Sequence, residues 1–406
     1  MPDQNPPTIS DSSLKVEKVI TGLKVPTSMA FSDDGDIVIL EKDGAVRLVS
    51  NGVLQPNPIF NAAVPNNSER GMLGVAVGKI DGTPKNLFLY YTETDGDQTK
   101  NRIYKYDWDG TGNLENGKLI LDLPGEPGPN HNGGKLKIGP DGMLYAVIGD
   151  LNRRGMLQNH KDGATPDDTS VILRINPSDG SPAQDNPFLN SSRTNSDSSS
   201  SSSSSDSSFS NLSKYYAYGV RNSFGIAFDP RTGTLWDVED GPTGYDEMNV
   251  VTPGFNSGWT QVMGPLDRHF LNTESIDDLV QFPGSHYADP VLSWSQSIGI
   301  TNLAFLNSTK LGENYAYNIF VGDVDNGSLF FFKVNSNRTG LDFGSTDAGG
   351  GLQDMVIDND EELNAVTIGT GFGRQGHGIV DIETGPDGYL YILTIAGDLY
   401  RIVPAA

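Results

Sequence analysis

One short pattern recurs four times along the chain and constrains its fold more than any other feature. Each copy has a turn built on Asp-Gly or Thr-Gly, followed by alternating apolar and aromatic residues. Glycine accepts the positive φ angle that tight hairpin turns require, so each copy predicts a β-hairpin. The copies are FSDDGDIVIL (31–40), IGPDGMLYAVIGD (138–150), FDPRTGTLWDVED (228–240) and TGPDGYLYILT (384–394).

Strand-like runs recur throughout the sequence, and no segment has the sustained apolar period of a long amphipathic helix. Many short strands with a repeated signature predict an all-β fold, a six-bladed β-propeller with four-stranded antiparallel blades. We expect LKVEKVIT (14–21) to pair with GDLYRIV (397–403) and close the ring. An array of β-sandwiches is the alternative, but no domain-sized linker divides the chain.

The propeller is expected to form a single domain over residues 14–406, after an N-terminal tail at 1–13. A serine-rich stretch at about 191–210 is of low complexity and cannot bury apolar surface, which predicts a disordered surface insert. It is either a tolerated insertion or a glycosylated or partner-binding arm.

Composition narrows the classes of function. The formal net charge is −24, and no Lys/Arg cluster suited to nucleic acid is visible. The acidity serves either solubility or the binding of cations such as Ca²⁺. No apolar run approaches the ~20 residues that a membrane-spanning helix needs. The absence of cysteine excludes disulfides and thiolate metal sites.

Several Asn-x-Ser/Thr triplets favour a glycoprotein that is secreted, extracellular or periplasmic. The sequence starts with MPDQNPPTIS, so we expect any export leader to be absent from it. A monomer or homodimer is expected.

His131 is the first candidate for chemistry. It lies in NHNGGKLKIGPDG (130–142), where Gly133 and Gly134 would let the backbone approach a ligand. A histidine there can act as a general base near neutral pH. The plainer interpretation is a loop histidine with satisfied hydrogen bonds.

Two further stretches carry specific polar groups. Arg221 and Asn222 stand side by side before a predicted strand and offer donors and an acceptor suited to carboxylates or carbonyls. Arg221 could equally be paired with one of the many acids. The Gly241–Pro242 turn frees backbone carbonyls close to Asp246 and Glu247, which are hard oxygen ligands of the kind that Ca²⁺ prefers. The alternative there is an acidic turn that ends a strand.

The order and spacing of these stretches resemble the glucose/sorbosone dehydrogenase family, which includes the soluble aldose dehydrogenases that depend on pyrroloquinoline quinone (PQQ). The resemblance covers nearly the whole chain. The matching stretches are ERGMLGVAV (69–77), HNGGKLKIGPDGMLYAVIGD (131–150), ILRINPSDGSPAQDNPF (172–188), GVRNSFGIAFDPRTGTLW (219–236), GPTGYDEMNVVTPGFNSGW (241–259) and GPDGYLYILT (385–394).

The resemblance implies a six-bladed propeller and a role for each candidate. His131 matches the base that takes the proton from the anomeric hydroxyl of the sugar. Arg221 and Asn222 match a pair that contacts the quinone oxygens. The resemblance also implies two calcium ions, one on the carbonyls of Gly241 and Pro242 beside PQQ, and a structural one that Glu247 binds.

The chain departs from the family at the carboxylate-binding end of PQQ. Asp325 stands where relatives have a lysine, and Gly378 and Val380 stand where they have an arginine pair. Glu69 replaces a frequent glutamine. An extra carboxylate beside a trianion weakens binding unless other cations replace the missing ones. The candidates for that replacement are Arg153, Arg154, Arg374 and His377.

The sequence thus predicts an oxidoreductase that oxidises an aldose at its anomeric carbon to a lactone, using PQQ and Ca²⁺, with an external electron acceptor. The alternative is an extracellular, calcium-containing propeller that binds a glycan or protein without redox chemistry. A hydrolase or lactonase with a metal-activated water is a third possibility.

Overall fold

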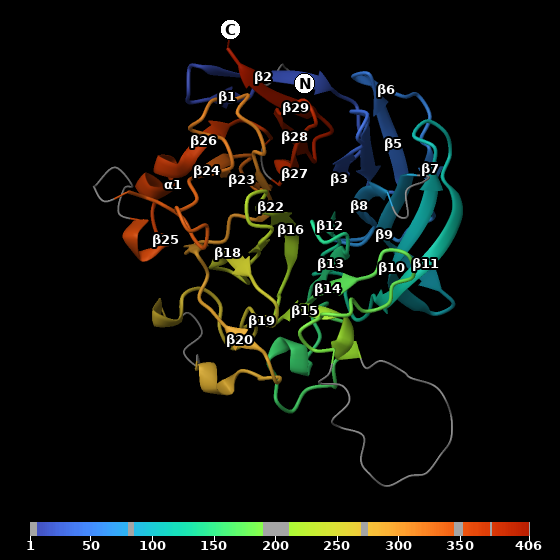
Figure 1. Cartoon of the computed structure of the whole chain (residues 1–406), viewed down its shortest axis with the longest axis vertical. Coiled ribbons are helices and arrows are strands. Elements are labelled where there is room, and N and C mark those ends of the chain that lie inside the picture. The colour runs from blue at the N-terminus through green and yellow to red at the C-terminus, as the bar shows by residue number, and fades with distance from the viewer. Residues whose placement is uncertain are drawn as a thin grey trace.

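The computed structural model describes residues 6–79, 85–189, 211–268, 275–344, 352–373 and 376–405. The described strands form six hydrogen-bonded sheets arranged around a common centre (Figure 1). Within these residues there is one α-helix, α1 (Asp360–Val366). The serine-rich insert lies outside the described residues, so its disorder stays a prediction.

The sheets follow one another along the chain. The first sheet contains β3 (Pro26–Phe31), β4 (Ile37–Glu41), β5 (Ala45–Ser50), β6 (Val53–Leu54) and β7 (Phe60–Asn61), and the second contains β8 (Met72–Lys79), β9 (Lys85–Asp95), β10 (Gln98–Trp108) and β11 (Glu115–Pro124). The third contains β12 (Leu136–Ile138), β13 (Leu144–Ile148), β14 (Val171–Ile175), β15 (Tyr215–Tyr218), β19 (Phe255–Asn256) and β20 (His286–Tyr287), and the fourth contains β16 (Ser223–Phe228), β17 (Leu235–Glu239), β18 (Asp246–Val251), β21 (Leu292–Trp294) and β25 (Val356–Ile357). The fifth contains β22 (Ile300–Phe305), β23 (Ile319–Asp323), β24 (Leu329–Phe332), β26 (Thr367–Thr370) and β1 (Thr8–Ile9), and the sixth contains β27 (Ile379–Thr384), β28 (Leu390–Thr394), β29 (Leu399–Pro404) and β2 (Leu14–Ile20).

One strand of each sheet lies at the centre. These strands contact one another in a closed cycle, from β3 through β8, β12, β16, β22 and β27 back to β3. A closed ring of sheets confirms the predicted all-β propeller. The sheets are less uniform than expected. They hold four to six described strands, and the outer pairs β15–β19, β19–β20 and β21–β25 are parallel.

The ends of the chain close the ring as predicted. β2 pairs antiparallel with β29, with Lys15 opposite Val403 and Glu17 opposite Arg401. The segment expected to be a tail includes β1, which pairs with β26.

The four signature stretches all form the turn between the central strand and the next strand of a sheet, namely β3–β4, β12–β13, β16–β17 and β27–β28. In two of them the turn aspartate also fixes a tyrosine. Tyr145 donates to Asp141 over 3.0 Å, and Tyr391 donates to Asp387 over 2.9 Å. The hairpin prediction is confirmed because the signal is local to the turn.

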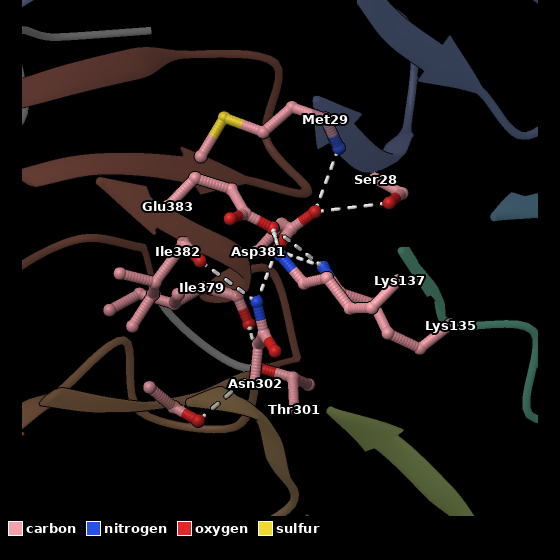
Figure 2. A network of polar contacts seen from close by, with 11 residues as sticks. Ser28, Met29, Lys135, Lys137, Thr301, Asn302, Ile379, Asp381, Ile382 and Glu383 are labelled. Atoms are coloured by element: carbon pink, nitrogen blue, oxygen red, sulfur yellow. Dashed lines mark hydrogen bonds and ion pairs between the residues drawn. The ribbon is translucent and has the colours of Figure 1, made fainter. Parts of the chain in front are cut away.

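A buried polar network joins the central strands (Figure 2). Asp381 Oδ1 accepts from Lys135 Nζ at 2.6 Å, and Asp381 Oδ2 accepts from the backbone N–H of Met29 at 2.7 Å. Asn302 also donates to Asp381. Burial by itself would lower the pKa of Lys135, but the carboxylates of Asp381 and Glu383 raise it. Lys135 is therefore a charged group that the protein already neutralises.

No helix within the described residues is both long enough and apolar enough to cross a membrane.

Candidate functional site

A cavity of about 380 Å³ opens beside the central strands, and Gly133, two residues after the predicted base, forms part of its wall. Its wall includes Ser28 and Thr301 near the buried network. The charged residues on its wall are Lys42, Glu69, Lys135, Asp240 and Asp325.

His131 lies in a left-handed turn, with φ of 60°, and its side chain is almost fully buried. Its Nδ1 lies 2.6 Å from Oδ1 of Asp150. A carboxylate at this distance favours the tautomer with the proton on Nδ1, which leaves the lone pair on Nε2. This arrangement is compatible with proton acceptance by Nε2, and the role of His131 as a base stays a prediction.

Gly133 and Gly134 allow close packing of the chain, and their predicted role in ligand approach stays a prediction. A Cβ on Gly133 would lie 2.8 Å from the carbonyl oxygen of Val147, and a Cβ on Gly134 would lie 2.5 Å from Cβ of Leu73. The glycines are therefore needed for close packing of the chain on itself, although Gly133 also contacts the cavity.

Glu69 connects His131 to Asn222. One of its oxygens, Oε2, accepts from the backbone N–H of His131 at 2.6 Å and from Nδ2 of Asn222 at 3.2 Å. Sequence reasoning noted Glu69 only as an unfavourable charge. In the structure this carboxylate positions two of the candidate residues.

Arg221 lies beside the same group. Its Nη1 donates to the backbone carbonyl of Asp240 at 2.7 Å, and its own backbone N–H donates to Glu239 at 2.9 Å. It forms no salt bridge with any described residue, contrary to the plainer interpretation. Arg221 Nε and Asn222 Oδ1 are buried without a hydrogen-bond partner among the described residues. Since buried polar groups are normally paired, these two atoms suit a bound polar ligand.

The Gly241–Pro242 turn follows Asp240 and so lies next to Arg221. A Cβ on Gly241 would lie 2.0 Å from the carbonyl oxygen of Gly244, so only glycine is accommodated. Asp246 accepts from the backbone N–H of Gly241 at 2.9 Å. No described backbone N–H donates to the carbonyls of Gly241 or Pro242, which leaves them available to a cation.

Glu247 belongs to a buried acidic cluster, which we define as Asp237, Glu239 and Glu247. Glu239 on β17 pairs in register with Glu247 on β18, and Asp237 lies on the same face of β17. Neither buried carboxylate oxygen of Asp237 has a hydrogen-bond partner of good geometry among the described residues, although the nearby amide of Asn249 opposes the rise that burial causes in the pKa of this carboxyl. Sequence reasoning missed Asp237 and Glu239. The sequence does contain a signal for them, which is a pair of acids at alternate positions of an otherwise apolar strand.

Burial raises the pKa of all three carboxyls. The pKa of Glu239 rises to about 7. The pKa values of Asp237 and Glu247 rise well above their usual range, through burial first and then through the charge of Glu239. Three buried carboxylates are costly without a neutralising cation. Ca²⁺ binds carboxylate oxygens of this kind, but the described residues contain no group of three or more Asp, Glu, His or Cys side chains arranged to hold a metal ion.

Hydrogen bonds and chain neighbours link the six predicted site residues, although none of them is among the described residues that line the cavity. His131 and Asn222 share Glu69, and Arg221 reaches the Gly241–Pro242 turn through Asp240. The backbone of Arg221 also contacts Glu239 of the acidic cluster, to which Glu247 belongs.

The departures from the family have clear structural consequences. Asp325 and Val380 line the cavity. A Cβ on Gly378 would lie 2.6 Å from the carbonyl of Asp323, so this backbone excludes an arginine there.

Of the four cations named as possible replacements, Arg153, Arg154 and His377 do not line the cavity. Arg153 pairs with Asp167, and Arg154 pairs with Asp162. Arg374 lies outside the described residues. Lys42, which the sequence analysis did not name, lines the cavity. Its ammonium group forms no salt bridge with a described carboxylate. Burial lowers its pKa, and the charge of Glu69 opposes this effect.

Comparison with known proteins agrees with this architecture. The family model described as Glucose / Sorbosone dehydrogenase matches residues 23–401. Aldose sugar dehydrogenase YliI of Escherichia coli is 25% identical over 97% of this chain and 94% of its own length. The crystal structure of a putative oxidoreductase (glucose dehydrogenase) from Thermus thermophilus is 27% identical, with a TM-score of 0.70, and covers 96% of this chain and 100% of its own.

The PQQ-bound form of an aldose sugar dehydrogenase from Streptomyces coelicolor shares the fold, with 21% identity and a TM-score of 0.66 over 97% of this chain and 99% of its own. The family match extends over nearly the whole propeller and includes every candidate residue. The chain therefore belongs to the Glucose / Sorbosone dehydrogenase family, as the motifs predicted.

Proposed function

We propose that this protein is a PQQ- and Ca²⁺-dependent aldose dehydrogenase that oxidises the anomeric carbon of a sugar to a lactone. The observation that carries the proposal is the His131–Asp150 pair beside the unsatisfied atoms of Arg221 and Asn222. A base and a polar anchor for a second molecule thus occupy one site.

Each group has a defined task in this proposal. Nε2 of His131 takes the proton of the anomeric hydroxyl, and Asp150 stabilises the imidazolium that forms. Bound PQQ would supply the acceptor for the hydride leaving the anomeric carbon, and electrons would pass on to an external acceptor. Arg221 and Asn222 would hold the quinone oxygens.

Calcium is assigned to two places. The free carbonyls of Gly241 and Pro242 would hold one ion beside the quinone, where it acts as a Lewis acid. The acidic cluster, including Glu247, would hold a structural ion, and the unpaired oxygens of Asp237 support this assignment.

The remaining parts of the proposal concern the domain, its location in the cell and its oligomeric state. We take each of the six sheets as one blade of a single propeller domain over residues 14–406. The protein would be exported, glycosylated, and a monomer or homodimer.

Reconstitution tests the function. The protein is incubated with PQQ and Ca²⁺, and bound-quinone absorbance and dye reduction are measured with a panel of aldoses. We expect saturable PQQ binding and dye reduction that depends on both additions. No binding at micromolar PQQ would contradict the proposal and favour the non-redox propeller, which the carboxylates Glu69, Asp240 and Asp325 on the cavity wall also favour.

Asp325→Lys provides a sharper test of the cavity charge. The substitution removes a carboxylate and restores the cation found in relatives, so we expect PQQ to bind at least about 10-fold more tightly. Asp325→Asn should give a smaller gain, because it removes the negative charge without adding a positive one. Isothermal titration with PQQ measures both. Equal affinities in the three proteins would show that Asp325 does not face the cofactor.

A further inference from the structure

One indole ring contacts both halves of the site. Nε1 of Trp259 donates to Oδ2 of Asp150 at 2.7 Å, while Oδ1 of the same carboxylate faces His131. The guanidinium carbon of Arg221 lies 5.4 Å from the centroid of the Trp259 ring. Trp259 thus touches the partner of the base and the anchor proposed for the quinone.

The hydrogen bond of Trp259 is exceptional within this chain. The sequence has four tryptophans, and within the described part of the chain the buried indole nitrogens of Trp108, Trp236 and Trp294 have no hydrogen-bond partner. Only the Trp259 indole donates, and it donates to a carboxylate, which makes a stronger bond than a neutral acceptor does.

The main chain of Trp259 is also fixed. Its N–H donates to the carbonyl of Gly219 at 3.1 Å, and Nδ2 of Asn159 donates to its carbonyl at 2.8 Å. Gly219 lies two residues before Arg221. The ring is therefore held in place by the segments that carry the site.

We propose that Trp259 is a positioning residue of the reaction, an inference that rests on the proposed function. Its N–H holds Oδ2 of Asp150, so that Oδ1 stays directed at Nδ1 of His131 and the proton remains on that nitrogen. Its ring supports the guanidinium of Arg221 by a cation–π contact. One side chain thus couples the proton acceptor to the anchor of the quinone.

Trp259→Phe separates the two roles, because it removes the N–H but keeps an aromatic face. We expect kcat to fall about 10-fold with PQQ affinity nearly unchanged. In the protein without PQQ, ¹⁵N NMR of the His131 ring should show less of the Nδ1–H tautomer. Trp259→Leu should additionally weaken PQQ binding, and Trp259→His, which keeps a ring N–H, should recover part of the tautomer signal.

Trp108→Phe is the matched control, because it removes an indole N–H that has no partner. It should leave the tautomer, kcat and PQQ affinity as in the wild type. A Trp259→Phe protein with the wild-type tautomer would overturn the proposal, whatever its activity. If the wild type oxidises no aldose but Trp259→Phe still changes the tautomer of His131, the positioning role is supported. Only the dehydrogenase assignment is then contradicted.

Discussion

Replacing His131 with alanine is expected to lower kcat for aldose oxidation by about 10²–10⁴-fold, the usual contribution of a general base. The substitution removes the proposed base while leaving Arg221 and Asn222 intact. The affinity for PQQ should therefore change little. Stopped-flow dye reduction and a PQQ titration measure the two quantities separately.

His131→Asn strengthens this experiment. His131 has a positive φ, which asparagine adopts readily, and the asparagine amide can still donate to Asp150. Its activity should be as low as that of the alanine variant, because neither has a base. His286→Ala is the control, since this exposed histidine contacts Thr252 at 2.8 Å and the ring of Phe255, and none of the site residues. Equal losses of kcat and PQQ affinity in both His131 variants would indicate a structural role instead.

The parts of the fold that the sequence could predict are those with local signals. The Asp-Gly turns specify their own hairpins through one glycine and one aspartate, so β12–β13 and β27–β28 appear where the motifs place them. The pairing of β2 with β29 was predictable because both runs alternate and lie at the two ends of a closed ring. The additional outer strands, such as β19 and β20, are two residues long and carry no such pattern.

The contacts between site residues were harder to predict from the sequence, because these residues come from distant parts of the chain. Glu69 lies 62 positions before His131 and 153 before Asn222, and only the folded ring brings them together. Asp150 follows a predicted strand, yet nothing local shows that it faces His131 across a turn. The glycines before β12 were assigned to ligand approach, and their lack of a Cβ also serves packing against Leu73 and Val147.

The acidic cluster leads to the second large prediction, a calcium-dependent stability that requires Asp237. At pH 8, Ca²⁺ at about 100 times its Kd should raise the free energy of unfolding by about 3 kcal/mol relative to EDTA. Asp237→Asn should lose most of this gain, because it removes the negative charge and replaces one buried carboxylate oxygen with an amide nitrogen that cannot bind a cation. It should also be more stable than the wild type in EDTA, since it relieves repulsion from Glu239 and Glu247. Asp97→Asn, at an exposed site, should behave as the wild type.

The pH dependence tests the same cluster independently. The folded pKa values of its carboxyls, about 7 for Glu239, lie above those of the unfolded chain, so the folded state binds more protons. The resulting stability is complete below about pH 4 and is lost as the pH rises through the folded pKa values. Without Ca²⁺, denaturant unfolding should show a free energy that falls from pH 5 to pH 8. The gain from Ca²⁺ should grow over the same interval, because the ion binds the ionised carboxylates. A calcium effect that is equal at both pH values, or intact in Asp237→Asn, would place the ion elsewhere.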